Sequence, residues 1–157
     1  MIMDFHAHIF PPHILANRAP YLARDHTFSH LYSDPKARLS TADELVEKMD
    51  AWGIQVAVTV NMGWSVHEFC VETNDYILES ARRFPDRLVP FCVVNPALGG
   101  KAVEEVERCA MLGARGIGEL HSYAQGCRLD DSRVMGPVME VVQRHGLIVL
   151  THSSEPV

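Results

Sequence analysis

The same succession of helix and strand signals occurs four times along the chain and limits the folds that the chain can adopt. Each time, a stretch with helical periodicity is followed by a glycine or proline and then by a short apolar run. The helical stretches are expected at residues 41–52, 66–83, 101–112 and 132–145. They are followed by Gly53, Pro85, Gly113 and Gly146, which are residues that end helices. The apolar runs cover residues 54–61, 88–96, 114–120 and 147–152 and have the composition of strands buried on both faces.

A fifth strand is expected at residues 2–9, where the sequence reads IMDFHAHI. Five strands separated by helices predict an α/β fold with parallel strands, because parallel neighbours need a long crossover connection. The apolar content of 47% is enough for a sizeable core. We therefore predict a single domain over residues 1–157.

Two arrangements of this repeat compete, an open doubly wound sheet and a partial (β/α)8 TIM barrel. A barrel takes about 250 residues for eight units, so five units take roughly 156, and the chain has 157 residues. This agreement favours the amino-terminal five-eighths of a barrel. Residues 10–40 depart from the repeat, and we expect a loop with one short helix near 12–23 above the carboxyl end of the first strand.

Composition narrows the class of protein further. The formal net charge of −6 argues against nucleic acid as a partner and gives no electrostatic attraction to anionic membranes. The four cysteines form no C-x-x-C pair, so we expect reduced, mostly buried thiols. There is no signal-like first segment and no apolar run of roughly 20 residues, and we expect a cytoplasmic protein acting on a small molecule.

Polar residues of ligand type stand where the expected strands end. Side chains alternate along a strand, so His6 and His8 share one face of the first strand. Glu119 and His121 end the fourth strand, and His152 ends the fifth. The carboxyl ends of parallel strands meet at one rim, and His152 reaches the first two histidines only if the fifth strand lies across a small barrel.

These residue types have the chemistry of a metal site. Neutral imidazole ligands do not cancel the positive charge of a zinc ion, and two or three of them leave one coordination position open for water. The charge of the ion lowers the pKa of that water to about 7. A carboxylate beside the ion can carry the proton, and Glu119 is the candidate for that role. His121 is the candidate for a hydrogen bond within the pocket.

The segments DFHAHIF (residues 4–10), GARGIGELH (113–121) and LTHSSEP (150–156) carry a family resemblance in their order and spacing. The chain resembles the metal-dependent amidohydrolase superfamily, specifically the amidohydrolase-2 group of hydrolases and carboxylate decarboxylases. The resemblance implies a (β/α)8 barrel with a divalent metal, most often zinc. It matches His6 and His8 to the ligand pair of strand one and His152 to the ligand of strand five. Glu119 occupies the strand-four position, where relatives use a ligand or another active-site residue.

Relatives also use a histidine after strand six and an aspartate after strand eight. The five expected strands include neither position, so we expect incomplete zinc binding and little turnover by these residues alone.

Four functions remain open from the sequence. The leading one is a metal-dependent hydrolase acting on a small carbonyl or carboxylate compound, and a decarboxylase of the same family is its alternative. A third is a non-catalytic α/β subunit, a homo-oligomer joined through exposed strand edges. The fourth, a nucleotide-binding open sheet, is suggested by GARGIG, but these glycines do not open a helix.

Overall fold

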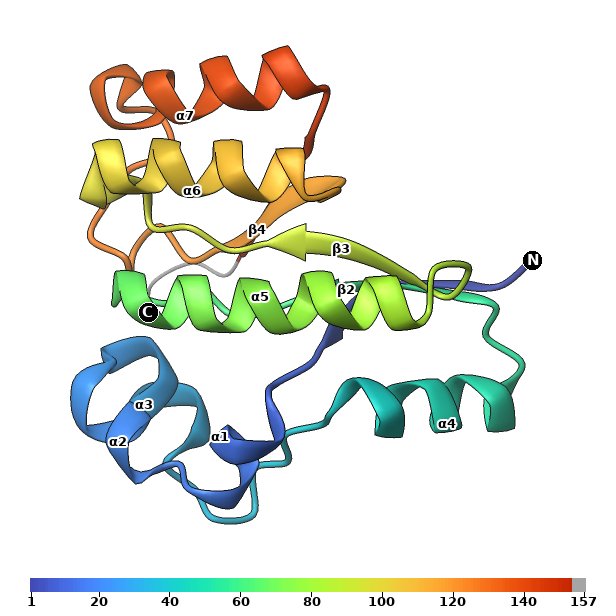
Figure 1. Cartoon of the computed structure of the whole chain (residues 1–157). Coiled ribbons are helices and arrows are strands. Elements are labelled where there is room, and N and C mark those ends of the chain that lie inside the picture. The colour runs from blue at the N-terminus through green and yellow to red at the C-terminus, as the bar shows by residue number, and fades with distance from the viewer. Residues whose placement is uncertain (154–157) are drawn as a thin grey trace.

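The computed structural model describes residues 1–153, which contain one five-stranded parallel sheet (Figure 1). The strands are β1 (Met3–His8), β2 (Val56–Val60), β3 (Leu88–Cys92), β4 (Gly116–Leu120) and β5 (Ile148–Thr151). They lie in the order β1-β2-β3-β4-β5, and every neighbouring pair is parallel. All five predicted strands are present. The last residues of the LTHSSEP segment, from Ser154 onward, lie outside the described part.

The sheet is curled rather than flat. β1 and β5 are the outermost strands of the sheet order, yet histidines at the ends of both contact the same carboxylate on β4. Only a sheet that closes part of the way into a barrel brings its two edges to one side chain. The structure therefore confirms the partial (β/α)8 barrel and rules out the flat open sheet.

The predicted helices follow the strands in the expected order. They are α4 (Ala42–Trp52), α5 (His67–Arg83), α6 (Gly100–Met111) and α7 (Ser132–His145), with a short 3-10 helix η1 (Pro96–Leu98) before α6. Thr41 caps α4 in a reciprocal capping box with Glu44. Gly53 and Gly146 end α4 and α7 in the left-handed conformation, as the sequence predicts.

The segment between β1 and α4 contains more structure than the sequence predicts. It forms α1 (Pro12–Ala16), α2 (Ala19–Arg24) and α3 (His26–Tyr32), where one short helix was expected. These helices gather at the end of the sheet towards which the strand arrows point (Figure 1). Their aromatic side chains pack into one cluster with Trp64, whose ring stacks on Phe28 at 5.0 Å between centroids. Tertiary packing therefore supports helices too short to be stable alone.

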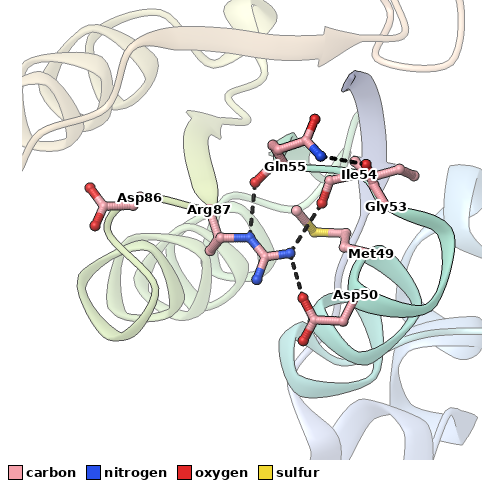
Figure 2. A pocket seen from close by; sticks show the side chains of 7 residues that line it. All are labelled: Met49, Asp50, Gly53, Ile54, Gln55, Asp86 and Arg87. Atoms are coloured by element: carbon pink, nitrogen blue, oxygen red, sulfur yellow. Dashed lines mark hydrogen bonds and ion pairs between the residues drawn. The ribbon is translucent and has the colours of Figure 1, made fainter. Parts of the chain in front are cut away.

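A hollow of about 430 Å³ lies at the opposite end of the sheet, where α4 leads into β2 (Figure 2). Arg87 closes one side of it and donates hydrogen bonds to the carbonyls of Ile54 (3.1 Å) and Gln55 (2.9 Å). The same guanidinium forms an ion pair with Asp50 at 2.7 Å. These bonds join the turn before β2 to the turn before β3, so we assign this arginine to the scaffold.

The cysteines agree with the expectation of reduced thiols. All four are free, three of them are buried, and Cys127 is half-buried. Among the described residues, no helix is both long and apolar enough to span a membrane.

A buried carboxylate joins α5, α6 and β3. Glu105 is 4% exposed and accepts hydrogen bonds from Arg108 and from the Asn74 side chain, the latter at 2.8 Å. Asn74 in turn exchanges two hydrogen bonds with the backbone of Val93. Burial alone would raise the pKa of Glu105, but the hydrogen bonds from Arg108 and Asn74 outweigh it and hold the pKa below its ordinary value.

We expect Glu105→Ala to lower the free energy of unfolding by about 2 kcal/mol at neutral pH, because it leaves donors of Arg108, Asn74 and Cys109 without this acceptor. The native pKa of Glu105 is depressed, so its stabilisation is complete above the ordinary pKa of about 4.3 and is lost as the pH falls below it. Urea denaturation should therefore show a smaller difference in the free energy of unfolding between Glu105→Ala and wild type at acid pH than at neutral pH. The control is Glu104→Ala, at an exposed neighbouring position, which should change the free energy of unfolding little. An equal loss of stability in both variants would contradict the role given to Glu105.

Gly118 permits the close contact between β4 and β5. Its φ is +130°, and a Cβ there would lie 2.2 Å from the carbonyl oxygen of Leu150. No side chain fits that space without moving the neighbouring strand. The residue before Glu119 is therefore restricted to glycine.

Gly118→Ala should destabilise the fold by about 3 kcal/mol, because the added methyl group meets backbone and the φ is unfavourable for alanine. Gly100→Ala, where a Cβ meets nothing within 4 Å, should stay within about 1 kcal/mol of wild type. Thermal or urea unfolding monitored by circular dichroism measures both. A Gly118→Ala protein as stable as Gly100→Ala would show that the strands can separate without cost.

Candidate metal centre

All five of the residues predicted for the site lie at the carboxyl end of the sheet. His6 and His8 are on β1, Glu119 is on β4, His121 directly follows β4, and His152 directly follows β5. Backbone hydrogen bonds fix their positions across the strands. The Glu119 amide donates to the carbonyl of Asn61 (3.1 Å), and the His152 amide donates to the carbonyl of Leu120 (2.9 Å).

Glu119 is at the centre of this group. One carboxylate oxygen, Oε2, lies 3.3 Å from Nε2 of His6 and 3.3 Å from Nε2 of His8. The same oxygen lies 3.1 Å from Nε2 of His121. The other oxygen, Oε1, lies 2.6 Å from Nδ1 of His152. The Glu119 side chain is 6% exposed, so this negative charge has exchanged water for four imidazole rings.

The rings are packed against one another in two pairs. The Nε2 atoms of His6 and His8 are 2.8 Å apart, and the two rings stack at 4.9 Å between centroids. The rings of His121 and His152 stack at 4.1 Å. These contacts hold the nitrogen atoms in place before any ligand arrives.

The donor set has the character of a cation site. Three ring nitrogens converge on one carboxylate oxygen, which has lone pairs for only two good hydrogen bonds. Nε2 of His121 is buried and has no hydrogen-bond partner among the described residues, although it lies close to the carboxylate. An unsatisfied buried nitrogen is costly, and a metal ion bound beside Glu119 or a hydrogen bond from a bound molecule would satisfy it.

The surroundings keep Glu119 ionised. Burial would raise the pKa of its carboxyl group, but the close imidazoles of His121, His8 and His152 outweigh burial and hold the pKa well below its ordinary range. A carboxylate with so low a pKa is a weak base. It is suited to hold a cation or to orient the histidines around it.

The possible ligands form two overlapping groups. His6, His8 and Glu119 offer ligand atoms within 4.8 Å of one another, and so do Glu119, His121 and His152. Glu119 belongs to both groups. The three histidines predicted as ligands from the sequence do not by themselves make up either group found in the described residues.

Two residues beside this group were missed by the sequence analysis. The Tyr32 hydroxyl lies 3.4 Å from Nδ1 of His8, and Gln125 accepts a hydrogen bond from the His121 amide at 3.0 Å. Gln125 also donates to the carbonyls of Trp64 and Val94. Neither belongs to a periodic segment, and no local pattern distinguishes them from surface residues.

Burial raises the pKa of Tyr32 to about 12, helped by the negative charge of Glu119 and opposed by Arg18. The hydroxyl is therefore protonated at neutral pH. Arg18 was also missed; its Nη1 atom is buried and has no hydrogen-bond partner among the described residues.

A family model matches almost the whole chain. Residues 3–156 match the model of the Amidohydrolase family, Amidohydro_2, and the chain belongs to that family. The resemblance inferred from the three sequence segments is thereby confirmed. No curated protein sequence matches the chain.

Solved structures share the fold at low sequence identity. The 5-carboxyvanillate decarboxylase of Novosphingobium aromaticivorans, with bound manganese and 3-methoxy-4-hydroxy-5-nitrobenzoic acid, is 20% identical with a TM-score of 0.79; the match covers 97% of this chain and 50% of that one. The 5-carboxyvanillate decarboxylase of Sphingomonas paucimobilis is 21% identical with a TM-score of 0.78, over 99% and 52% of the two chains. A probable 2-pyrone-4,6-dicarboxylic acid hydrolase of Acinetobacter baumannii, with citric acid bound, is 17% identical with a TM-score of 0.60, over 97% and 49%. The chain thus spans about half the length of these structures.

Proposed function

We propose that this chain provides the metal-binding part of an amidohydrolase-type barrel that hydrolyses or decarboxylates a small carbonyl or carboxylate compound. The observation that carries the proposal is the convergence of four imidazole rings on the buried Glu119 carboxylate. Hydrolysis is the leading reaction, as the chemistry of the residues suggests. In this proposal residues 1–157 correspond to the first five of eight βα units.

We assign His6, His8 and His152 as metal ligands, with Glu119 as a further ligand. Its low pKa suits a ligand better than the proton carrier expected from the sequence. His121 keeps the predicted role of a hydrogen bond within the pocket, since its Nε2 is buried and has no hydrogen-bond partner among the described residues. When bound, a divalent metal would polarise a substrate oxygen and make water more acidic.

Zinc is the metal expected from the sequence, and manganese is the one bound in the decarboxylase of Novosphingobium aromaticivorans. Histidine and carboxylate ligands suit both ions.

The ligand assignment predicts how substitutions change metal binding. Wild type should bind Zn²⁺ or Mn²⁺, and Glu119→Ala and His6→Ala should each lower the affinity by about a hundredfold or more, because each removes a ligand from a small set. Isothermal titration calorimetry and metal analysis after dialysis measure this. Glu107→Ala is the matched control, because Glu107 also contacts a histidine, His145 at 2.8 Å, but on the outer helices.

His152→Ala tests whether the ion bound by the first group, His6, His8 and Glu119, is also bound by His152. If His152→Ala lowers the metal affinity as much as His6→Ala does, one ion lies among His6, His8, Glu119 and His152. If only His6→Ala and Glu119→Ala lower the metal affinity, the site is restricted to the first group. Unchanged metal content in all three variants would remove the site and the proposed function with it.

Decarboxylation is the second candidate reaction. It is supported by the decarboxylases of Novosphingobium aromaticivorans and Sphingomonas paucimobilis, whose TM-scores exceed that of the probable hydrolase. Arg18 adds a positive charge near Tyr32 that is suited to a substrate carboxylate.

The two reactions give different products from different compounds. At the low turnover expected of these residues alone, the metal-loaded protein should release a detectable amount of CO2 from 5-carboxyvanillate if it decarboxylates, or open the ring of a detectable amount of 2-pyrone-4,6-dicarboxylate if it hydrolyses. Mass spectrometry of the products distinguishes the outcomes, and chelator should abolish either one. Product formation that survives the chelator would contradict a metal-dependent reaction.

Assembly through the sheet edges is the candidate function of another class. In the described residues β1 and β5 each pair with one strand only, and both carry exposed apolar side chains, Phe5 at 49% and Ile148 at 51%. Unpaired edges of this kind favour association. Sedimentation equilibrium over a range of concentrations measures it, and a monomer at every concentration would exclude a homo-oligomer.

A further inference from the structure

The two nitrogen atoms of His8 face different partners. Nε2 points to His6 and Glu119, at 2.8 and 3.3 Å, whereas Nδ1 lies 3.4 Å from the hydroxyl of Tyr32. A neutral imidazole carries one proton, and a nitrogen that binds a metal must not hold it. For Nε2 to serve as a ligand atom, the proton of His8 therefore has to be on Nδ1, where it faces Tyr32.

We propose that Tyr32 is a positioning residue of the metal centre: its phenolic oxygen accepts a hydrogen bond from the Nδ1–H of His8 and so leaves the Nε2 lone pair free. The inference rests on the proposed metal site and assigns a role to a residue outside the ligand set. Histidine ligands generally need such a partner for their second nitrogen to fix the tautomer and the ring orientation. A tyrosine hydroxyl can accept a hydrogen bond from Nδ1–H and still donate its own hydrogen elsewhere.

Aromatic packing holds the Tyr32 ring against His8. The Tyr32 ring lies edge-on to Phe10, with centroids 5.4 Å apart, and 5.0 Å from the ring of Phe28. Phe10 also makes an edge contact with the His8 ring at 6.4 Å. The tyrosine therefore has little freedom to move its hydroxyl away from the histidine.

The helix that carries Tyr32 is anchored by a buried carboxylate at its start. Asp25 is 1% exposed and caps α3 by accepting a hydrogen bond from the Phe28 amide at 2.9 Å. Its second oxygen accepts from the amide and the hydroxyl of Ser65, both at 2.7 Å, and from the Val66 amide at 3.2 Å. Asp25 thus joins the start of α3 to the loop after β2, and the placement of Tyr32 at the other end of α3 depends on that joint.

The test is Tyr32→Phe, which removes the hydroxyl and keeps the ring. We expect its affinity for Zn²⁺ and Mn²⁺ to fall by about ten- to a hundredfold, as for other outer partners of histidine ligands. The matched control is Tyr21→Phe in the same aromatic cluster, whose hydroxyl donates to Glu72 at 2.8 Å and not to a histidine. Competition titrations with a chelator should show the control within about twofold of wild type.

The second readout needs no metal. Long-range ¹H–¹⁵N spectra of the ¹⁵N-histidine-labelled protein report the tautomer of His8. Glu119 faces Nε2 at 3.3 Å and Tyr32 faces Nδ1 at 3.4 Å, so the quantity compared is the fraction of the Nδ1–H form. We expect this fraction to be the same in wild type and Tyr21→Phe and clearly lower in Tyr32→Phe, while urea denaturation shows the fold intact. This measurement is independent of the proposed function. If wild type bound no metal, the proposed metal site would be refuted, but the tautomer of His8 would still show whether Tyr32 holds its Nδ1 proton by a hydrogen bond.

Two results would overturn the inference. One is an Nε2–H tautomer of His8 in the wild-type protein. The other is a Tyr32→Phe protein in which the tautomer and the metal affinity both match those of Tyr21→Phe.

Discussion

The carboxylate of Glu119 is the interaction on which the site depends. It is a buried negative charge, and water has been replaced around it by imidazole rings from three strands or their ends. Removing a carboxylate from water costs several kcal/mol unless partners compensate. The compensation here comes from residues far apart in the sequence, so the curl of the sheet and the charge of the site support each other. A flat sheet would leave this charge without half of its partners.

The sequence predicts much of the scaffold because its signals are local. Helical periodicity, the left-handed glycines Gly53 and Gly146 and the β-branched runs each act within a few residues. The location of the site is also predictable, since the carboxyl ends of parallel strands share one edge. That edge brings His6, His8 and His152 close to Glu119, as expected if the strands curl into a small barrel.

The remaining details depend on tertiary contacts that leave no local pattern. Helices α2 and α3 are short and are held by a carboxylate cap and by aromatic packing against Trp64. The central position of Glu119 follows from the curl of the sheet and from side-chain directions, neither of which periodicity reveals. Tyr32 ends the short helix α3 and Gln125 lies in the turn after β4, and each contacts a site histidine through one hydrogen bond. The family match supports the barrel, but these contacts belong to this chain.

Asp25 has a consequence for motion around the site. Its two oxygens hold α3 and the turn at residues 65–66 through four hydrogen bonds at 1% exposure. A fluctuation that separated these segments would break several bonds at once and uncover an aromatic cluster, so it belongs to the rare, high-energy openings of the molecule. Small molecules that exchange rapidly with the site would therefore not pass beneath α3.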